Sequence, residues 1–297
     1  MKYFLGIDGG GTKTRFNVID ENNNIIFDGF SGPSSIDTVD LKTTYKNVVE
    51  YVNNLPYQFN SIHFGVGGVY TDKDIELLLD LLRDIENVSE DCSISASNDV
   101  YNLYSVALGR ENGMVVISGT GSVCYGQKGL NSTRIGGYGY KEGDPGSGYS
   151  IGLMALQTAC KYMDGREKVS KISVQILNSL NIKTYAELGD FVSHLDRTKI
   201  ASLAKLVLEN PNYRDSKKIL NKSSDDIVEM IIACKNNLQL DDDFKYALSG
   251  GVLHHESFQR LVLNKVNKIY PNARCIDFNN NSAFGAALIA KGNYDEL

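Results

Sequence analysis

Residues 3–14 read YFLGIDGGGTKT, a short apolar run that breaks into three glycines followed by Thr12 and Lys13. Alternating apolar residues resume in residues 16–19, so the pattern predicts a strand, a glycine-rich turn and a second strand. Glycines let the backbone take positive φ and bring its N–H groups close to an anion, while Thr12 and Lys13 add a hydroxyl and a cation. The hairpin is therefore typical of a turn that binds phosphate.

Asp8 ends the first apolar run of this hairpin. Its carboxylate would repel a phosphate unless a cation lay between them. The arrangement predicts a nucleotide phosphate with Mg²⁺, held by Asp8 directly or through water bound to the ion. The alternative is a hairpin turn that only needed flexibility.

The same pattern occurs a second time, about a hundred residues further along the chain. Apolar residues 114–117 lead into SGTGS at 118–122 and then into a short alternating run at 123–126. Two such hairpins suggest a duplicated unit, each half offering one phosphate-binding turn to a shared cleft. A third glycine turn, LSGGV at 248–252, follows a strand-like segment at 244–247.

Taken in order, these motifs resemble the N-acetylglucosamine kinase group of the actin, Hsp70 and hexokinase-like superfamily, to which the BadF/BadG-type ATPases also belong. The motifs are DGGGT at 8–12, Asn98-Asp99, SGTGS at 118–122, GGYGYKEGDPGSG at 136–148 and SGGV at 249–252. The resemblance runs from Met1 to about Lys291. It implies an α/β fold of two actin-like (RNase H-like) domains with a nucleotide cleft between them.

The resemblance also sets the expected domain boundaries. The N-terminal domain is expected over residues 1–110 and the C-terminal domain over 111–282, with a helical insertion at about 146–240. A C-terminal helix over 283–297 is expected to pack back on the first domain. The resemblance also implies a homodimer.

Composition agrees with a soluble enzyme of small molecules. The 297 residues fit two domains of about 150 residues each, and 22% charged with 42% hydrophobic residues is ordinary for a globular protein. The net charge of −6 argues against a nucleic-acid partner. No apolar run approaches the roughly twenty residues of a membrane span, so we predict no membrane partner. Asp8 interrupts the first apolar stretch where a signal peptide would continue, so we predict a cytoplasmic protein. The five cysteines form no C-x-x-C pair and are interpreted as reduced.

Phosphoryl transfer from ATP needs Mg²⁺, donors for the phosphates, a hydroxyl nucleophile and a carboxylate that takes its proton. Asp99 is our candidate for that carboxylate, since it stands between a strand end and a helix beginning near Val100, and the resemblance puts the catalytic base here. The alternative is an N-cap, because Asp or Asn before a helix is common for structural reasons. Asn98 or Asp99 could cap while Asp99 faces the sugar.

Asp144 is the second carboxylate of interest, because the resemblance implies that it bonds sugar hydroxyls; the alternative is a solvated turn residue. Most relatives have Trp where Tyr138 stands. The resemblance assigns to the sugar Ser35, Gly68, Asn98, Asp99, Ser122, Gly137, Tyr138, Gly139 and Asp144. It assigns to ATP·Mg²⁺ Asp8, Gly10, Gly11, Thr12, Lys13, Gly119, Thr120, Gly121, Gly250 and Gly251.

Two positions depart from the family pattern. Ser35 stands where N-acetylglucosamine kinases commonly carry Asn, and Val123 replaces an Asn found in some relatives. Both changes remove amide hydrogen bonds and leave more room, so N-acetylmuramic acid or plain glucosamine becomes a credible substrate. His254 and His255 are interpreted as a helix start with solvated imidazoles.

The motifs and the resemblance together predict an ATP-dependent kinase of N-acetylglucosamine or N-acetylmuramic acid, with glucosamine as an alternative. The resemblance implies that the 6-hydroxyl is the acceptor. A second hypothesis is an ATPase coupled to a partner, like the activators of 2-hydroxyacyl-CoA dehydratases. Those need cysteines that share an iron-sulfur cluster, whereas Cys124 is interpreted as a core residue. A sugar-sensing protein is a third hypothesis, disfavoured by the presence of Asp8, Thr12 and Asp99.

Overall fold

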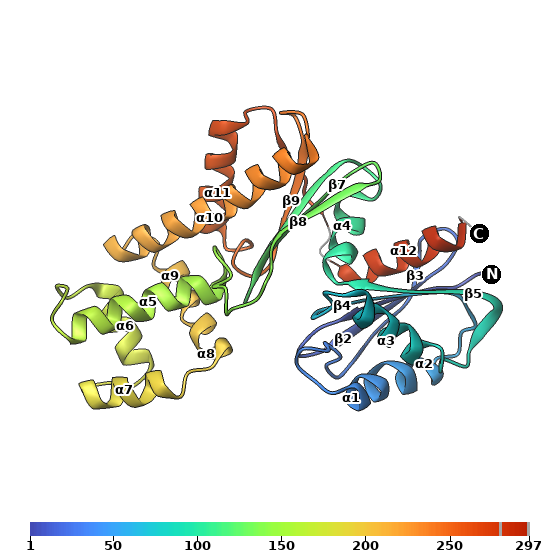
Figure 1. Ribbon diagram of the computed structural model, residues 1–297, viewed down its shortest axis with the longest axis horizontal. Helices are drawn as coiled ribbons and strands as arrows, with labels where there is room; N and C mark the ends of the chain where they lie inside the picture. The colour runs from blue at the N-terminus through green and yellow to red at the C-terminus, as the bar shows by residue number, and fades with distance from the viewer. Residues whose placement is uncertain (279–280, 296–297) are drawn as a thin grey trace. The chain divides into compact units, whose positions relative to one another are not determined.

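The computed structural model describes residues 1–278 and 281–295 and has two compact units. Unit 1 comprises residues 1–110 together with the C-terminal segment that begins at Phe278, and unit 2 comprises Glu111–Asp277. Each unit contains one five-stranded mixed sheet with helices (Figure 1). The predicted α/β fold with two similar units is confirmed.

The sheet of unit 1 has the strand order β3-β2-β1-β4-β5. Its strands are β1 (Phe4–Gly9), β2 (Thr14–Ile19), β3 (Ile25–Ser31), β4 (Phe59–Val66) and β5 (Val88–Asn98). β1 pairs antiparallel with β2 and parallel with β4, and β5 continues the parallel part. In the β1–β2 register Gly9 faces Thr14, which leaves residues 10–13 as the turn.

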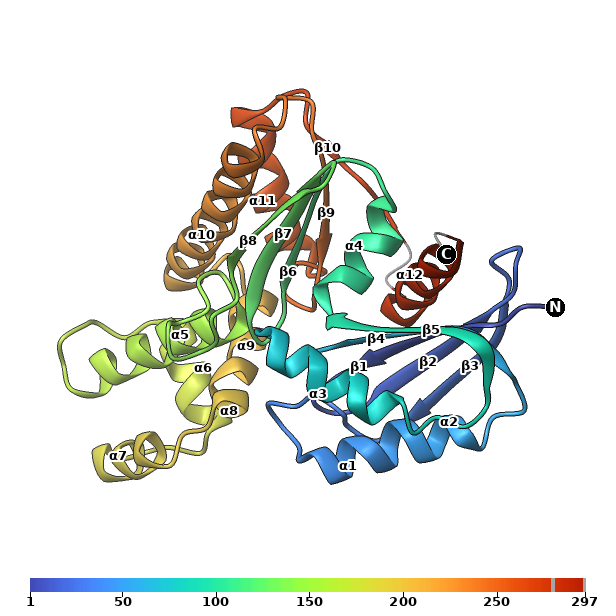
Figure 2. The same ribbon diagram turned by 45° about the vertical axis from the view of Figure 1, so that its right-hand side comes forward.

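Helices cover both faces of this sheet (Figure 2). They are α1 (Leu41–Tyr45), the π-helix η1 (Lys46–Glu50), α2 (Tyr51–Asn53), α3 (Asp72–Leu82), α4 (Val100–Leu108) and α12 (Ser282–Asp295). On one face Val48 and Val52 pack with Leu5, Ile7 and other buried side chains of the strands. On the other face α12 lies directly on β1, because a Cβ on Gly6 would fall 2.1 Å from the backbone nitrogen of Ala287.

Unit 2 repeats the topology of unit 1. Its strands are β6 (Gly113–Ser118), β7 (Ser122–Lys128), β8 (Asn131–Gly136), β9 (Lys245–Ser249) and β10 (Arg274–Cys275), in the order β10-β9-β6-β7-β8. β6 pairs antiparallel with β7 and parallel with β9, as β1 does with β2 and β4. The repeat seen in the two glycine hairpins therefore extends to the whole sheet.

Helices fill the segment for which a helical insertion was predicted. They are α5 (Gly148–Met163), α6 (Lys171–Ser179), α7 (Tyr185–Ser193), α8 (Arg197–Ser202), α9 (Ala204–Glu209) and α10 (Arg214–Leu238), with α11 (Glu256–Ile269) further on. In α10, Ile227 and Ile231 join the core with Met114 and Val116 of the sheet. Within the described part of the chain, no helix is both long and apolar enough to span a membrane.

Candidate functional site

Asp8 is held at the carboxyl end of β1 by two helices. Its Oδ1 accepts a hydrogen bond from Asn102 Nδ2 of α4 at 3.2 Å, and its Oδ2 accepts one from Ser282 Oγ of α12. Burial raises the pKa of Asp8, whereas the hydrogen bonds from Ser282 and Asn102 oppose the rise, as do the nearby charges of Arg15 and Lys13. The carboxylate is thus fixed in one orientation.

The glycine turn next to Asp8 owes its composition to close packing. We expected positive φ in this turn, but none of the three described glycines at 9–11 has it. A Cβ on Gly9 would instead lie 2.6 Å from Ser34 Oγ, and one on Gly10 would lie 3.1 Å from Lys13 O. Gly10 O accepts hydrogen bonds from the backbone of Ser34 and Ser35, so the turn and this loop form one structure. Thr12 and Lys13 are exposed beside it.

Asp99 begins α4 directly after β5, and its neighbour Asn98 does the capping. Asn98 Oδ1 accepts a hydrogen bond from Val100 N at 3.2 Å, while Asn98 Nδ2 donates to Val69 O at 3.0 Å. Asp99 makes no side-chain cap hydrogen bond in this described helix. Of the two alternatives for this pair, the cap belongs to Asn98.

Asp99 and Ser35 approach each other over Gly67. A Cβ on Gly67 would lie 3.0 Å from Ser35 Oγ and 3.6 Å from Asp99 Oδ2. Ser35 Oγ also bonds Gly67 O at 2.9 Å, and it contacts Asp37 Oδ1. Gly68 has φ +87°, and a Cβ there would lie 2.9 Å from the Asp37 backbone. Unit 1 therefore brings together four of the residues predicted to bind sugar: Ser35, Gly68, Asn98 and Asp99.

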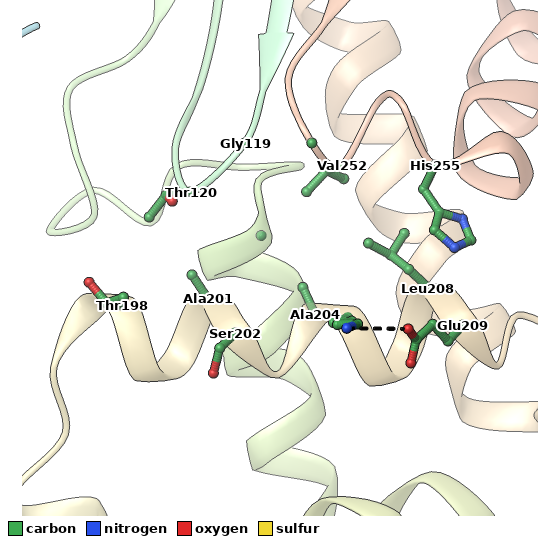
Figure 3. Close-up of a pocket in the computed structure, with 13 residues that line it drawn as sticks. Gly119, Thr120, Thr198, Ala201, Ser202, Ala204, Leu208, Glu209, Val252 and His255 are labelled. Atoms are coloured by element: carbon green, nitrogen blue, oxygen red, sulfur yellow. Dashed lines mark ion pairs between the residues drawn. The ribbon is translucent and has the colours of Figure 1, made fainter. Parts of the chain in front are cut away.

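In unit 2 the turn between β6 and β7 borders a cavity of about 600 Å³, a volume typical of small-molecule sites. It is lined by Gly119, Thr120, Gly148, Thr198, Ala201, Ser202, Ala204, Lys205, Leu208, Glu209, Gly251, Val252 and His255. Figure 3 shows Thr120 and Val252 on one side of it and the residues of α8 and α9 on the other. Three of the predicted nucleotide residues, Gly119, Thr120 and Gly251, thus line one cavity.

Among the glycines of unit 2 predicted to bind the nucleotide, Gly250 is required by its backbone conformation, whereas Gly119 and Gly251 leave open space. Gly250 has φ +95°, and a Cβ there would lie 2.4 Å from Ser118 O. A Cβ on Gly251 would have no described atom within 4 Å, and one on Gly119 would approach only Gly251 N, at 4.0 Å. The backbone of both turns is therefore open to a ligand such as a phosphate.

The histidines differ from our interpretation of two solvated imidazoles. His254 is exposed, whereas His255 is half-buried and lines the cavity, with Nδ1 3.0 Å from Ser257 Oγ. His255 immediately precedes α11, so the chain turns there and carries the ring inward. The sequence signal was two adjacent histidines, which does not tell which of them points into a cavity.

Asp144 is buried, with 1% of its surface exposed, so it is not a solvated turn residue. Its carboxylate forms an ion pair with Arg197, whose Nη2 lies 3.3 Å from Asp144 Oδ2. Burial raises the pKa of Asp144, and the charge of Arg197 opposes that rise. Ser122 lies in the same corner, because its Oγ donates to Pro145 O at 2.7 Å.

The remaining predicted sugar residues of unit 2 follow β8. Gly137 and Gly139 have φ +74° and +93°, and the Tyr138 side chain between them is 76% exposed. A Cβ on Gly137 would lie 3.0 Å from the Val123 side chain. Val123, which departs from the family pattern, therefore packs under the predicted sugar stretch.

The residues near Asp8 fit the expected Mg²⁺. Among the described residues, no three of the metal-ligating types His, Cys, Asp and Glu cluster together. Mg²⁺ bound to a nucleotide usually takes one or two carboxylates, with water and phosphate oxygens completing its shell. Asp8 would supply one such carboxylate, so a larger cluster of acidic residues is not needed.

The fold and these sites define a protein of the actin-like ATPase class, and comparison with known proteins specifies the family. Residues 5–290 match the BadF/BadG/BcrA/BcrD ATPase family, and the chain belongs to it. It is similar to the N-acetylmuramic acid/N-acetylglucosamine kinase of Clostridium acetobutylicum, with 30% identity over 99% of this chain and 100% of that one. It is also similar to the N-acetyl-D-glucosamine kinase of Dictyostelium discoideum, with 29% identity over 97% of each chain.

Solved structures agree on the fold. The putative N-acetylglucosamine kinase of Chromobacterium violaceum superposes with a TM-score of 0.80 at 21% identity, covering 98% of this chain and 99% of that one. A ROK family glucokinase of Streptomyces griseus superposes with a TM-score of 0.56 at 14% identity and the same coverage. This chain therefore shares its fold with both of these structures.

Proposed function

We propose that this protein is an ATP-dependent amino-sugar kinase that phosphorylates the 6-hydroxyl of N-acetylglucosamine or N-acetylmuramic acid. Full-length similarity to two enzymes named as kinases of these sugars supports the substrate class. The structural observation that carries the proposal is that Asn98 and Asp99, at the end of β5, have different contacts. Asn98 caps the helix, and the Asp99 carboxylate lies over Gly67 beside Ser35.

In this proposal Asp99 accepts the proton of the sugar hydroxyl as the oxygen attacks phosphorus. Asp8 would hold Mg²⁺ directly or through water, and the ion supplies positive charge to the phosphates when bound. Gly119, Thr120, Gly250 and Gly251 offer backbone to the nucleotide. Protein donors fixed before the reaction stabilise developing charge at no further reorganisation cost.

Plain glucosamine remains the alternative substrate, because Ser35 and Val123 both lack the amide that relatives use. The partner-coupled ATPase is the alternative from another class. Cys124 is fully buried in β7, which is unsuitable for holding a cluster shared between subunits. A homodimer stays a prediction from the resemblance, and a cytoplasmic location stays a prediction from the apolar pattern of the sequence. We propose the recycling of cell-wall amino sugars as the pathway.

The test is ADP release in a coupled assay with ATP·Mg²⁺ and four sugars: N-acetylglucosamine, N-acetylmuramic acid, glucosamine and glucose. We expect strong stimulation by an acetylated sugar over a control without sugar. Stimulation by glucosamine alone would move the substrate to the non-acetylated sugar. ADP release that does not depend on sugar would contradict the kinase and favour the partner-coupled ATPase.

A further inference from the structure

Arg197 lies on the backbone of the turn between β6 and β7, although it belongs to no sequence motif. It is the first residue of α8, far along the chain from that turn. A Cβ on Gly121 would fall 2.8 Å from Arg197 Nη2 and 3.1 Å from Asp144 Oδ2. The guanidinium and the carboxylate therefore meet directly above Gly121.

The guanidinium is held firmly but keeps donors to spare. Asp144 Oδ2 accepts from Nη2 at 3.3 Å, and Arg197 Cζ lies over the Tyr140 ring, 5.7 Å from the ring centroid. Arg197 Nε is buried and has no hydrogen-bond partner among the described residues. A guanidinium carries five donors, and the Arg197 side chain is 35% exposed, so its remaining donors can meet an acceptor that a ligand brings.

Asp144 is placed at a backbone cost. Its φ is +42°, a left-handed conformation that residues other than glycine seldom take. Strain of this kind persists where the surrounding structure enforces it, and it is frequent at binding sites. The turn thus aims a buried carboxylate at Arg197.

The cavity described above is lined by the residues of α8 that follow Arg197. Thr198, Ala201 and Ser202 of α8 line it together with Gly119 and Thr120 (Figure 3). Arg197 immediately precedes these residues, at the end of α8 that meets the glycine turn. A nucleotide with its base and ribose in the cavity and its phosphates along the turn would bring phosphate oxygens to Arg197.

We propose that Arg197 binds the phosphates of the nucleotide, and that Asp144, predicted above to bind the sugar, is also a positioning residue whose Oδ2 holds the guanidinium over the turn. The proposal rests on the proposed function in taking ATP as the ligand. The planar fork of arginine matches two phosphate oxygens at once, which the point charge of lysine does not. Arg197 thereby adds a cation to a turn that otherwise offers backbone and the Thr120 hydroxyl.

The experiment measures the affinity of ATP, ADP and adenosine by calorimetry, without sugar, for the wild type and for Arg197→Met and Arg197→Lys. A charge-assisted contact to phosphate predicts that Arg197→Met weakens ATP and ADP about 10- to 100-fold and leaves adenosine unchanged. Arg197→Lys is expected to fall between Arg197→Met and the wild type. Lys199→Gln is the matched control, because Lys199 lies on the same helix with its side chain 60% exposed, and it should change no affinity.

Two further variants keep the test decisive. Asp144→Asn is expected to weaken ATP and ADP less than Arg197→Met does, again without affecting adenosine. The double variant Arg197→Met/Asp144→Asn leaves no unpaired buried charge, so it provides a folded protein if the single change does not. An equal loss for adenosine and ATP, no loss for ATP, or a wild type that binds no ATP would overturn the proposal. Calorimetry without sugar measures nucleotide affinity and not turnover. A failed kinase assay would therefore not change the result for Arg197.

Discussion

Asn98 and Asp99 show how two adjacent side chains can do different work. The amide of Asn98 satisfies the first turn of α4 and the chain after β4, so the cap does not depend on Asp99. The Asp99 carboxylate is placed near Ser35 by the backbone of Gly67. A substitution at Asp99 should therefore affect chemistry more than folding.

We expect Asp99→Asn to lower kcat about 10²- to 10⁴-fold, the usual contribution of a general base. ATP affinity and the unfolding temperature should stay close to those of the wild type, since the amide keeps the shape and the cap belongs to Asn98. Steady-state kinetics with the preferred sugar and calorimetry with ATP check both parts. Asp80→Asn serves as the control, because Asp80 is 70% exposed on α3. A kcat near that of the wild type would reject Asp99 as the base.

Residues next to a glycine motif could be predicted from the sequence, whereas their partners could not. Asp8 and Asp99 stand in recognisable motifs at strand ends. Asn102 and Ser282, which hold Asp8, lie 94 and 274 residues away from it in the chain. Arg197 lies 53 residues from Asp144 in a polar helix start without a motif. Such contacts depend on the packing of distant elements, which local patterns do not encode.

At the scale of elements, a buried histidine links β4 to β5. His63 Nδ1 lies 2.8 Å from Ser95 Oγ, and Nε2 lies 2.9 Å from Ser97 Oγ. Asn293 of α12 donates to the same Ser95 hydroxyl at 2.9 Å. Desolvation lowers the pKa of His63 to about 3, so the ring is neutral in the folded protein at neutral pH.

This link predicts acid sensitivity. In the unfolded chain His63 takes up a proton below about pH 6.5, whereas in the folded protein it stays neutral down to about pH 3. The contribution of neutral His63 to the free energy of unfolding is therefore complete above pH 6.5 and is lost as the pH falls. The loss is up to about 1.4 kcal/mol per pH unit. We expect His63→Gln to remove this part of the slope in urea unfolding between about pH 7 and pH 5.

His194→Gln provides the comparison, because the His194 side chain is 75% exposed. That variant should keep the pH dependence of the wild type. If His63→Gln and His194→Gln showed equal slopes, the buried histidine would not be the source of the acid sensitivity.

Elements with a strong apolar period were predicted, and those without one were not. The strand before Asn98 and the helix after it were expected, and both are present as β5 and α4. β8 was not expected, because its residues are polar or only half-buried and show no apolar alternation. The first half of α10 shows no clear apolar period, because Asp215, Ser216, Ser223 and Ser224 occupy buried positions where apolar residues would have revealed it.

At the scale of the whole molecule, the repeated sheet hides an asymmetry of the chain. Unit 2 is continuous, whereas unit 1 takes its last helix from the C-terminal segment. In unit 1, Phe4 and Ile19 are buried against Ala287 and Ala290 of α12. Without α12 this face of the sheet would be open to water.

The asymmetry predicts different behaviour of fragments. Residues 111–277 expressed alone should give cooperative thermal unfolding, since their core is contained within them. Residues 1–110 alone should not, because the apolar surface around Phe4 and Ile19 would be exposed; a peptide of residues 278–297 added in trans should restore folding. Circular dichroism melts of each fragment check this. Cooperative melting of residues 1–110 without the peptide would contradict it.

The bond from Ser282 to Asp8 has a consequence for biosynthesis. A ribosome makes the glycine hairpin before unit 2, but it makes the helix that carries Ser282 after unit 2. Unit 2 can fold while it is being translated, whereas unit 1 has to wait for residues made after unit 2 is complete. Asp8 therefore gains its hydrogen bond from Ser282 only after unit 2 has been translated, and a chain that terminates within unit 2 lacks that bond.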